Sequence, residues 1–131
     1  MVSRADFVTQ MYQAGLAAGL TDAAARVMAS HAALESDYGN SAPGNNFFGI
    51  KAGSSWNGRT QRLWTHEVNA NGVTVRVKQT FRAYDSPEEG IADRVAFMGS
   101  RFPDFNSAET VGDAYDALQH GVYGRYATAS Q

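Results

Sequence analysis

The chain has 131 residues, of which 44% are hydrophobic, a size and composition that suit one compact domain with a single core. A formal net charge of −2 gives no global electrostatic reason to bind nucleic acid or an anionic membrane. No stretch approaches the roughly 18 apolar residues that span a bilayer, and the first residues lack the apolar core of a secretory signal. The absence of cysteine excludes disulfides and thiolate metal sites. We therefore expect one domain over residues 1–131 that does not insert into a membrane.

Residues 3–19 have the pattern of an amphipathic helix that starts at Ser3 and ends at Gly19. Its apolar stripe is expected to pack as core on the next helix, and it consists of Phe7, Val8, Met11, Ala14, Gly15 and Ala18. We assign this helix no chemistry.

A second helix is expected from the Thr21 cap to Tyr38. A period of 3.6 residues gathers four residues on the same side as Glu35, namely Ala24, Met28, His31 and Tyr38. Glu35 is therefore expected to point inward. An unpaired carboxylate in apolar surroundings has a raised pKa and can deliver a proton near neutral pH. The alternative is a carboxylate that caps the loop or pairs with a buried Arg or Lys.

Residues 31–52, HAALESDYGNSAPGNNFFGIKA, resemble the signature of the glucosaminidase family of peptidoglycan hydrolases, glycoside hydrolase family 73. The family pattern is an apolar helix that ends in Leu-Glu-Ser, an aromatic residue and a glycine, a polar stretch, and Asn-Asn-Φ-Phe-Gly-Ile-Lys, where Φ is apolar. The matching positions are Leu34, Glu35, Ser36, Tyr38, Gly39 and residues 45–51. Residues 81–98 match a second block, Phe-Arg-x-Tyr-x-Ser before a helix, and residues 126–128 match a third.

The resemblance implies a mainly α (α+β) fold, a lysozyme-like helical domain with one small β-hairpin lobe beside the cleft. It also implies hydrolysis of the β-1,4 bond after N-acetylglucosamine in the cell-wall glycan, with Glu35 as general acid. The family fold occurs in flagellar rod-cap proteins, autolysins and phage or phage-like lysins, so flagellar rod or virion proteins are partners that the resemblance allows. The expected location is periplasmic, cell-wall associated or virion-associated, within a longer exported or virion-associated protein.

The loop at residues 41–58 contains groups that a sugar site uses: amides that donate and accept, aromatic faces, and glycines that let a ligand approach the backbone. Each residue also has a structural alternative, as a turn former, a core residue or a cover over the hairpin. With the resemblance, the expected substrate-binding residues are Tyr38, Asn45, Asn46, Phe48, Ile50, Lys51, Trp56 and Tyr123.

Residues 61–68 and 73–81 alternate apolar and polar around the turn sequence NANG, the pattern of a β-hairpin. A two-residue or a four-residue turn would place Glu67 on the same face as Thr65 and Arg76. By position, Glu67 matches a glutamate that family members carry in this hairpin and that has been proposed as the second carboxylate. The alternative is a cross-strand ion pair between Glu67 and Arg76.

Glycoside hydrolysis usually uses two carboxylates, whose separation decides between direct attack by water and a covalent route. A substrate with a 2-acetamido group offers a third route, in which the sugar's own carbonyl oxygen attacks C1. The sequence leaves these routes open, with Glu35, Glu67 and Tyr126 as the catalytic candidates. Tyr126 matches the tyrosine of the family's Tyr-Ala-Thr-Asp motif, which borders the cleft and can orient substrate. Ala129 replaces the Asp of that motif, which weakens any role for a carboxylate there.

Residues 86–89, Ser-Pro-Glu-Glu, predict the capped first turn of a helix, so Glu88 and Glu89 are expected to be structural. A last helix is expected from Ser107 to Gly121. Its inner stripe is expected to consist of Val111, Ala114, Tyr115 and Leu118.

The three histidines, His31, His66 and His120, lack metal-ligand spacing. The glycine-rich segments lack a phosphate-loop pattern, so neither a metal nor a nucleotide cofactor is expected. The predicted function is that of an endo-β-N-acetylglucosaminidase acting on peptidoglycan glycan strands. One alternative is a muramidase or lytic transglycosylase on the same fold, and the other is a non-catalytic wall-binding or morphogenetic module.

Overall fold

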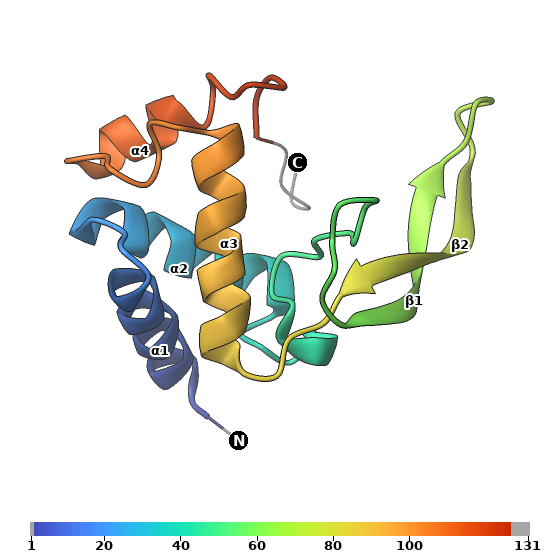
Figure 1. Ribbon diagram of the computed structural model, residues 1–131, viewed down its shortest axis with the longest axis horizontal. Coiled ribbons are helices and arrows are strands. Elements are labelled where there is room, and N and C mark those ends of the chain that lie inside the picture. The colour runs from blue at the N-terminus through green and yellow to red at the C-terminus, as the bar shows by residue number, and fades with distance from the viewer. Residues whose placement is uncertain (1, 127–131) are drawn as a thin grey trace.

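Residues 2–126 are described by the computed structural model, and within them lie four α-helices and one two-stranded antiparallel sheet (Figure 1). The helices form one body, and the hairpin projects from its side (Figure 1). This arrangement confirms the mainly α, α+β fold predicted from the sequence. Among the described residues, no helix has the length and apolar character that crossing a membrane requires.

The first two helices begin where the sequence predicted. α1 spans Arg4–Ala17, and the hydroxyl of its cap Ser3 accepts a hydrogen bond from the amide three residues on. α2 spans Asp22–Ser36, and the hydroxyl of Thr21 does the same. These oxygens satisfy N–H groups that the first helical turn leaves unpaired. The Thr21 hydroxyl also donates to the carbonyl of Ala108, so the start of α2 is tied to the C-terminal third of the chain.

α3 spans Pro87–Arg101 and begins at the predicted cap, Ser86. Gly90 lies buried in its first turn, where a Cβ would come within 2.3 Å of the carbonyl oxygen of Asn45. Any side chain at this position would push the helix and the loop apart. Glycine therefore allows the loop that follows α2 to lie directly against α3.

α4 is shorter than predicted: it spans Val111–Ala117 and is capped by Thr110. Residues 106–108 do not join the helix because Thr21 holds both ends of that segment. Its amide donates to the carbonyl of Asn106 and its hydroxyl donates to the carbonyl of Ala108. The predicted inner stripe is half wrong, since Ala114 and Leu118 are buried whereas Val111 and Tyr115 are exposed. A helix of two turns presents a narrow face to the core, and small residues occupy that face.

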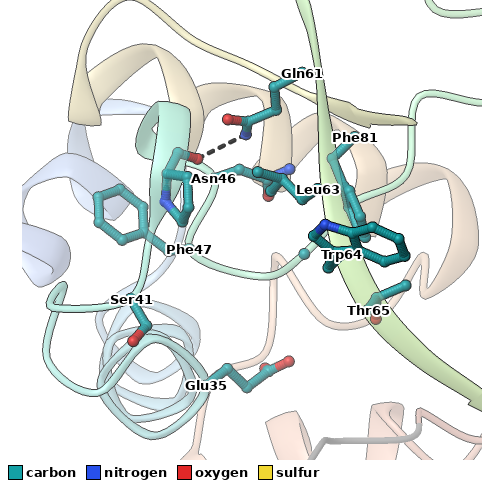
Figure 2. Close-up of a pocket in the computed structure, with 11 residues that line it drawn as sticks. Glu35, Ser41, Asn46, Phe47, Gln61, Leu63, Trp64, Thr65 and Phe81 are labelled. Atoms are coloured by element: carbon teal, nitrogen blue, oxygen red, sulfur yellow. Dashed lines mark hydrogen bonds between the residues drawn. The ribbon is translucent and has the colours of Figure 1, made fainter. Parts of the chain in front are cut away.

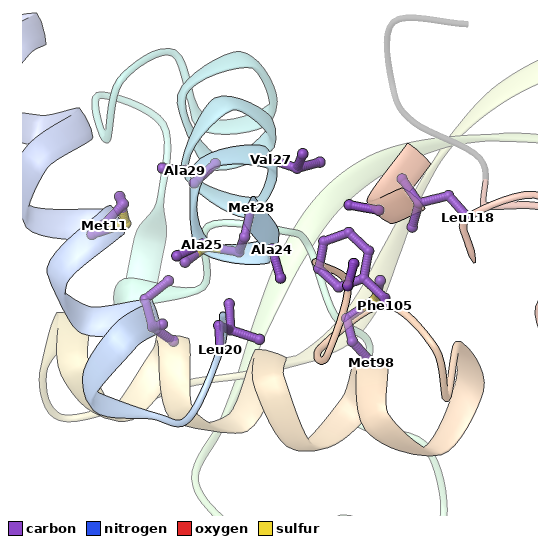
Figure 3. Close-up of a cluster of buried hydrophobic side chains, with 14 of the residues drawn as sticks. Met11, Leu20, Ala24, Ala25, Val27, Met28, Ala29, Met98, Phe105 and Leu118 are labelled. Atoms are coloured by element: carbon purple, nitrogen blue, oxygen red, sulfur yellow. The ribbon is translucent and has the colours of Figure 1, made fainter. Parts of the chain in front are cut away.

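The hydrophobic core lies where the four helices meet (Figure 3). α2 contributes mainly alanines to it, which allow the neighbouring helices to approach closely. Met11, Met28 and Met98 are almost completely buried and fill the irregular space between these small side chains. The close packing holds α2 rigidly along its length, and Glu35 lies at the end of this helix.

β1 spans Thr60–Val68 and β2 spans Thr74–Arg82, and the two strands form an antiparallel hairpin. The turn contains three residues, 70–72, and a backbone hydrogen bond of 2.9 Å closes it. Its last residue, Gly72, has a φ of +77°, the left-handed conformation that such a turn requires at this position.

The prediction that Glu67 and Arg76 lie on the same face of the hairpin is therefore wrong. Both turn lengths considered were even, and an odd turn shifts the pairing by one residue, which exchanges the faces of one strand. Glu67 lies opposite Val75, whereas Arg76 lies opposite His66. Among the described residues Glu67 and Arg76 form no ion pair, and the Arg76 guanidinium lies 4.1 Å from the ring centroid of Trp64.

Asn46 fastens the loop between α2 and β1 to the end of β2. Its buried side-chain amide donates to the carbonyls of Ile50, at 3.0 Å, and Arg82, at 2.9 Å. Its oxygen accepts a hydrogen bond of 3.0 Å from the Ile50 amide. The backbone amides of Ala52 and Arg82 continue this pairing by donating to the carbonyls of Thr80 and Ile50. One amide side chain thus fixes the loop beside the hairpin.

We expect Asn46→Ala to lower the free energy of unfolding by about 2–3 kcal/mol, because it leaves buried backbone groups without partners. Urea denaturation measures this change. Asn40→Ala is the control, since Asn40 is exposed and its replacement should change stability by less than about 0.5 kcal/mol. Equal stability of the two variants would contradict the role assigned to Asn46.

Candidate active site

Glu35 lies in the last turn of α2, and the next residue fixes the end of that helix. Ser36 is fully buried; its hydroxyl donates to the carbonyl of Ala32 at 2.6 Å and accepts from the amide of Gly39 at 2.9 Å. The three residues after Ser36 all have positive φ values, so the helix ends sharply. The Leu-Glu-Ser sequence therefore places a carboxylate at a rigid helix end.

Two cavities meet at Glu35. The hairpin pocket, of about 220 Å³, lies between residues 41–49 and the hairpin, and Figure 2 shows the Glu35 side chain extending toward it from α2. The α3 pocket, of about 570 Å³, lies between residues 48–55 and α3. Glu35 is the one carboxylate among the described residues that line these cavities. A chain-like ligand that passes through both would therefore pass this carboxylate.

Tyr126 holds the Glu35 carboxylate in place. Its hydroxyl donates to Oε2 of Glu35 at 2.8 Å and accepts a hydrogen bond of 2.9 Å from Nη2 of Arg94. The Tyr126 ring stacks on that of His31, with centroids 5.5 Å apart and 7° between the planes. The ring of Phe102 meets it edge-on at 5.7 Å. The phenol is thus fixed both at its ring and at its hydroxyl.

These hydrogen bonds identify the oxygen that can carry an acidic proton. An arginine side chain only donates, so Arg94 occupies an acceptor position of the Tyr126 hydroxyl, whose own proton is directed to Glu35. Oε2 of Glu35 is therefore an acceptor. Oε1, which Tyr126 does not contact, is therefore the oxygen better placed to carry the hydrogen of the protonated carboxyl.

Burial raises the pKa of the Glu35 carboxyl above its ordinary value, and the Tyr126 hydrogen bond and the charge of Arg94 partly oppose this rise. Burial also raises the pKa of Tyr126 to about 12, so the phenol remains a donor at neutral pH. Burial, and then the charge of Arg94, lower the pKa of His31 to about 4, so that ring is neutral. The carboxyl thus retains its proton to a higher pH than a carboxyl in water.

Arg94 is a site residue that the sequence analysis missed. It lies on the buried face of α3, between Ile91 and Met98, and is only 3% exposed. Its guanidinium lies 3.9 Å from the ring centroid of Phe48 and 5.0 Å from that of Tyr126. The sequence contained a signal for Arg94. It lies at helical spacing from the apolar residues Ile91 and Met98, and an arginine on such a buried face must have a buried partner.

Four of the predicted substrate-binding residues line the cavities. Phe48, Ile50 and Lys51 line the α3 pocket, and Asn46 lines the hairpin pocket. Asn46 and Ile50 are buried and hydrogen-bonded to each other, whereas Phe48 and Lys51 are more exposed. The loop at residues 41–58, in which the sequence analysis found groups suited to a sugar site, therefore contributes to both cavities.

The other four predicted residues do not line either cavity. Tyr38 packs edge-on against Phe7. The side chains of Asn45 and Trp56 each donate to a backbone carbonyl, at 3.0 and 2.8 Å. Tyr123 is 81% exposed. Asn45 has a φ of +57°, which agrees with the turn-former alternative considered for it.

The hairpin supplies pocket residues that the sequence analysis did not select. Gln61, Leu63, Trp64 and Thr65 line the hairpin pocket, and the Gln61 amide donates to the Pro43 carbonyl at 2.7 Å (Figure 2). Their relation to the cavity could not be read from the alternating pattern, because it depends on how the hairpin is attached to the helical body.

Glu67 does not line either pocket and instead pairs with Lys51. The Lys51 Nζ to Glu67 Oε1 distance is 2.6 Å, and both side chains are partly exposed. A bridge between Lys51 and Phe81 places the lysine beside the hairpin. The predicted cross-strand ion pair with Arg76 is therefore wrong, because Glu67 pairs with Lys51 of the loop.

Among residues 2–126, no group of three or more His, Asp or Glu side chains is arranged to hold a metal ion. Ala129, the position of the missing Asp in the Tyr-Ala-Thr-Asp motif, lies outside the described residues.

We expect Arg94→Met to raise the pKa of both Glu35 and His31, because the charge of Arg94 lowers both pKa values. NMR titration of the Glu35 carboxyl carbon and the His31 ring measures the two shifts. Arg94→Lys is the control that keeps the charge and should shift both pKa values less. Unchanged pKa values in Arg94→Met would show that Arg94 does not act on Glu35 electrostatically.

The family model described as Glucosaminidase, mannosyl-glycoprotein endo-beta-N-acetylglucosaminidase, matches residues 12–131. Peptidoglycan hydrolase FlgJ of Salmonella typhimurium is 36% identical over 103 residues, which cover 72% of this chain and 32% of the relative. FlgJ of Vibrio cholerae is 34% identical over 137 residues, which cover 98% of this chain and 40% of the relative. The chain thus spans about a third of the length of these curated relatives.

Solved structures agree with these matches. A peptidoglycan hydrolase mutant from Sphingomonas sp. A1 superposes with a TM-score of 0.72 at 32% identity, covering 93% of this chain and 84% of that one. A C-terminally truncated glycoside hydrolase domain of Salmonella typhimurium FlgJ gives a TM-score of 0.67 at 31% identity, covering 89% and 83%. The family resemblance drawn from residues 31–52 is thereby confirmed, and the chain belongs to the glucosaminidase family.

Proposed function

We propose that the chain hydrolyses the β-1,4 bond after N-acetylglucosamine in peptidoglycan, with Glu35 as general acid. The observation that carries this proposal is the position of Glu35, a carboxyl with a raised pKa at the junction of two cavities. The family to which the chain belongs and the relatives called peptidoglycan hydrolases support the substrate.

In the proposed reaction, Glu35 delivers the proton on Oε1 to the oxygen of the leaving sugar. Tyr126 keeps Oε2 engaged and prevents the carboxyl from rotating. As the proton leaves, negative charge develops on the carboxylate, where the Tyr126 hydroxyl and the Arg94 charge stabilise it. Arg94 and Tyr126 act here as positioning residues for Glu35.

For the displacement at C1 we propose assistance by the substrate. Glu35 is the one carboxylate lining the cavities within the described part of the chain, and Lys51 engages Glu67. The carbonyl oxygen of the 2-acetamido group can attack C1 as the bond from C1 to the protonated leaving oxygen breaks, without a second protein carboxylate. Water then opens the resulting ring and gives a proton back to Glu35. The alternative, in which Glu67 is the second carboxylate, requires Glu67 to leave Lys51 and to enter the cleft.

We propose that sugar rings bind in both cavities. The hairpin pocket offers the exposed face of Trp64 and the hydroxyl of Thr65, groups that stack on or hydrogen-bond to a pyranose. Phe48, Ile50 and Lys51 line the other side of the cleft.

One hydrophobic cluster includes residues from all four α-helices of the described chain. We therefore propose that residues 1–131 act as one catalytic domain. Its substrate would place its action outside the cytoplasm, at the cell wall. Flagellar rod or virion proteins, the partners that the resemblance implies, are proposed only as neighbours of a longer exported or virion-associated protein.

We expect Glu35→Gln to lower the rate of peptidoglycan digestion by at least about 100-fold, because glutamine cannot donate the proton. Mass spectrometry of borohydride-reduced fragments measures both the rate and the bond that is cut. Wild-type fragments that end in N-acetylglucosaminitol support the proposal. Muramitol or anhydromuramyl ends would assign a muramidase or a lytic transglycosylase instead. Release of no fragments by a folded wild type would favour the wall-binding module.

We expect Glu67→Gln to retain turnover within about tenfold of the wild type, because Glu67 neutralises Lys51 and does not line a cavity. Digestion rates measured beside those of Glu35→Gln provide the comparison. A loss as large as that of Glu35→Gln would contradict substrate assistance and assign Glu67 as the second carboxylate.

A further inference from the structure

The α3 pocket is lined by four cationic side chains. Lys51 and Arg82 come from the loop and the end of β2, and Arg94 and Arg101 come from α3. The hairpin pocket on the other side of Glu35 contains no Lys or Arg among its described lining residues. The two halves of the cleft therefore differ in charge.

Two of these four cations are neutralised within the protein. Lys51 pairs with Glu67 at 2.6 Å, and Arg82 pairs with Asp93 at 2.9 Å. Within the described part of the chain, Arg94 and Arg101 form no such ion pair. The α3 pocket thus has an excess of positive charge beside a carboxyl that is neutral when it is ready to act as an acid.

Arg101 is the cation that is placed to meet a ligand. It lies at the end of α3, half-buried, and its guanidinium lies 4.4 Å from the ring centroid of Phe97 and 5.1 Å from that of Tyr123. These cation–π contacts hold the guanidinium in the wall of the pocket. Arg94, by contrast, is buried and hydrogen-bonded to Tyr126.

We propose that the α3 pocket binds a carboxylate of the muramic-acid half of peptidoglycan, with Arg101 as the main contact. This inference rests on the proposed function and adds to it the part of the substrate that lies on each side of Glu35. N-acetylglucosamine is neutral, whereas N-acetylmuramic acid carries a lactyl group that ends in a carboxylate or in a peptide with carboxylates. The planar fork of arginine matches a carboxylate with two parallel hydrogen bonds.

This assignment fixes the direction in which the glycan lies. The bond after N-acetylglucosamine joins a neutral sugar to a muramic acid, and Glu35 must lie between the two. The neutral sugar then occupies the hairpin pocket, with its amide, hydroxyl and indole groups, and the muramic acid occupies the α3 pocket. Arg101 is in this reading a specificity residue, because it selects the sugar that follows the cleaved bond.

The test compares three substrates. The first is intact peptidoglycan, the second is the same material with its carboxylates converted to methylamides, and the third is glycan freed of peptide by an amidase, which leaves the lactyl carboxylate. The variant is Arg101→Gln. The matched control is Arg26→Gln, which removes the same charge from an exposed position near the start of α2.

We expect Arg101→Gln to lower kcat/KM on intact peptidoglycan by roughly tenfold, mainly through KM, as for the loss of one charge-assisted hydrogen bond. On the methylamide substrate the variant and the wild type should agree within about twofold. A loss on intact peptidoglycan assigns a carboxylate of the peptide. A loss confined to the peptide-free glycan assigns the lactyl carboxylate, which is an amide where the peptide is attached. Equal losses on the intact and methylamide substrates, or no loss on any substrate, would overturn the inference.

A binding measurement separates this inference from the proposed function. Two soluble acids, N-acetylmuramic acid with its free lactyl carboxylate and a muramyl dipeptide with a peptide carboxylate, are each titrated calorimetrically beside their methylamides into Glu35→Gln and into Glu35→Gln with Arg101→Gln. Tighter binding of the free acid that disappears with Arg101→Gln supports the carboxylate site even if the wild type cuts none of the three substrates. Equal affinity for acid and methylamide in both pairs rejects the site even if the wild type cuts all three.

Discussion

The hydrogen bond from Tyr126 to Glu35 is the interaction on which the arrangement of the site depends. It joins residues 91 positions apart in the chain, and Arg94 on α3 completes it from a third segment. The carboxyl therefore has a defined orientation only when α2, α3 and the C-terminal segment are packed together. Folding of the helical body and assembly of the proposed acid are thus the same event.

The surrounding structure serves to hold this arrangement rigid. The alanines of α2 allow close packing along the helix that ends in Glu35, and Ser36 fixes its last turn. On the other side, the Asn46 side chain forms three hydrogen bonds, two with Ile50 in its own loop and one with Arg82 of β2. The helix end and the loop are in this way fixed independently, and the cavities lie between them.

The cleft is asymmetric about Glu35, and the asymmetry has a physical use. A neutral pocket with amide and aromatic groups suits an uncharged sugar, whereas an excess of cations suits an anionic one. In the alternating glycan, every bond after N-acetylglucosamine has this neutral sugar on one side and an anionic muramic acid on the other. Charge can therefore select the bond, while the carboxyl with the raised pKa supplies the proton.

The sequence by itself determined the helix starts at Ser3, Thr21 and Ser86, since capping depends on residues close together in the chain. It also determined Glu35 as the candidate acid and the family. Only the tertiary structure decided the partners: Lys51 for Glu67 and Arg94 for Tyr126. These contacts join segments that no local pattern connects, and one residue of turn length was enough to reverse the faces of the hairpin.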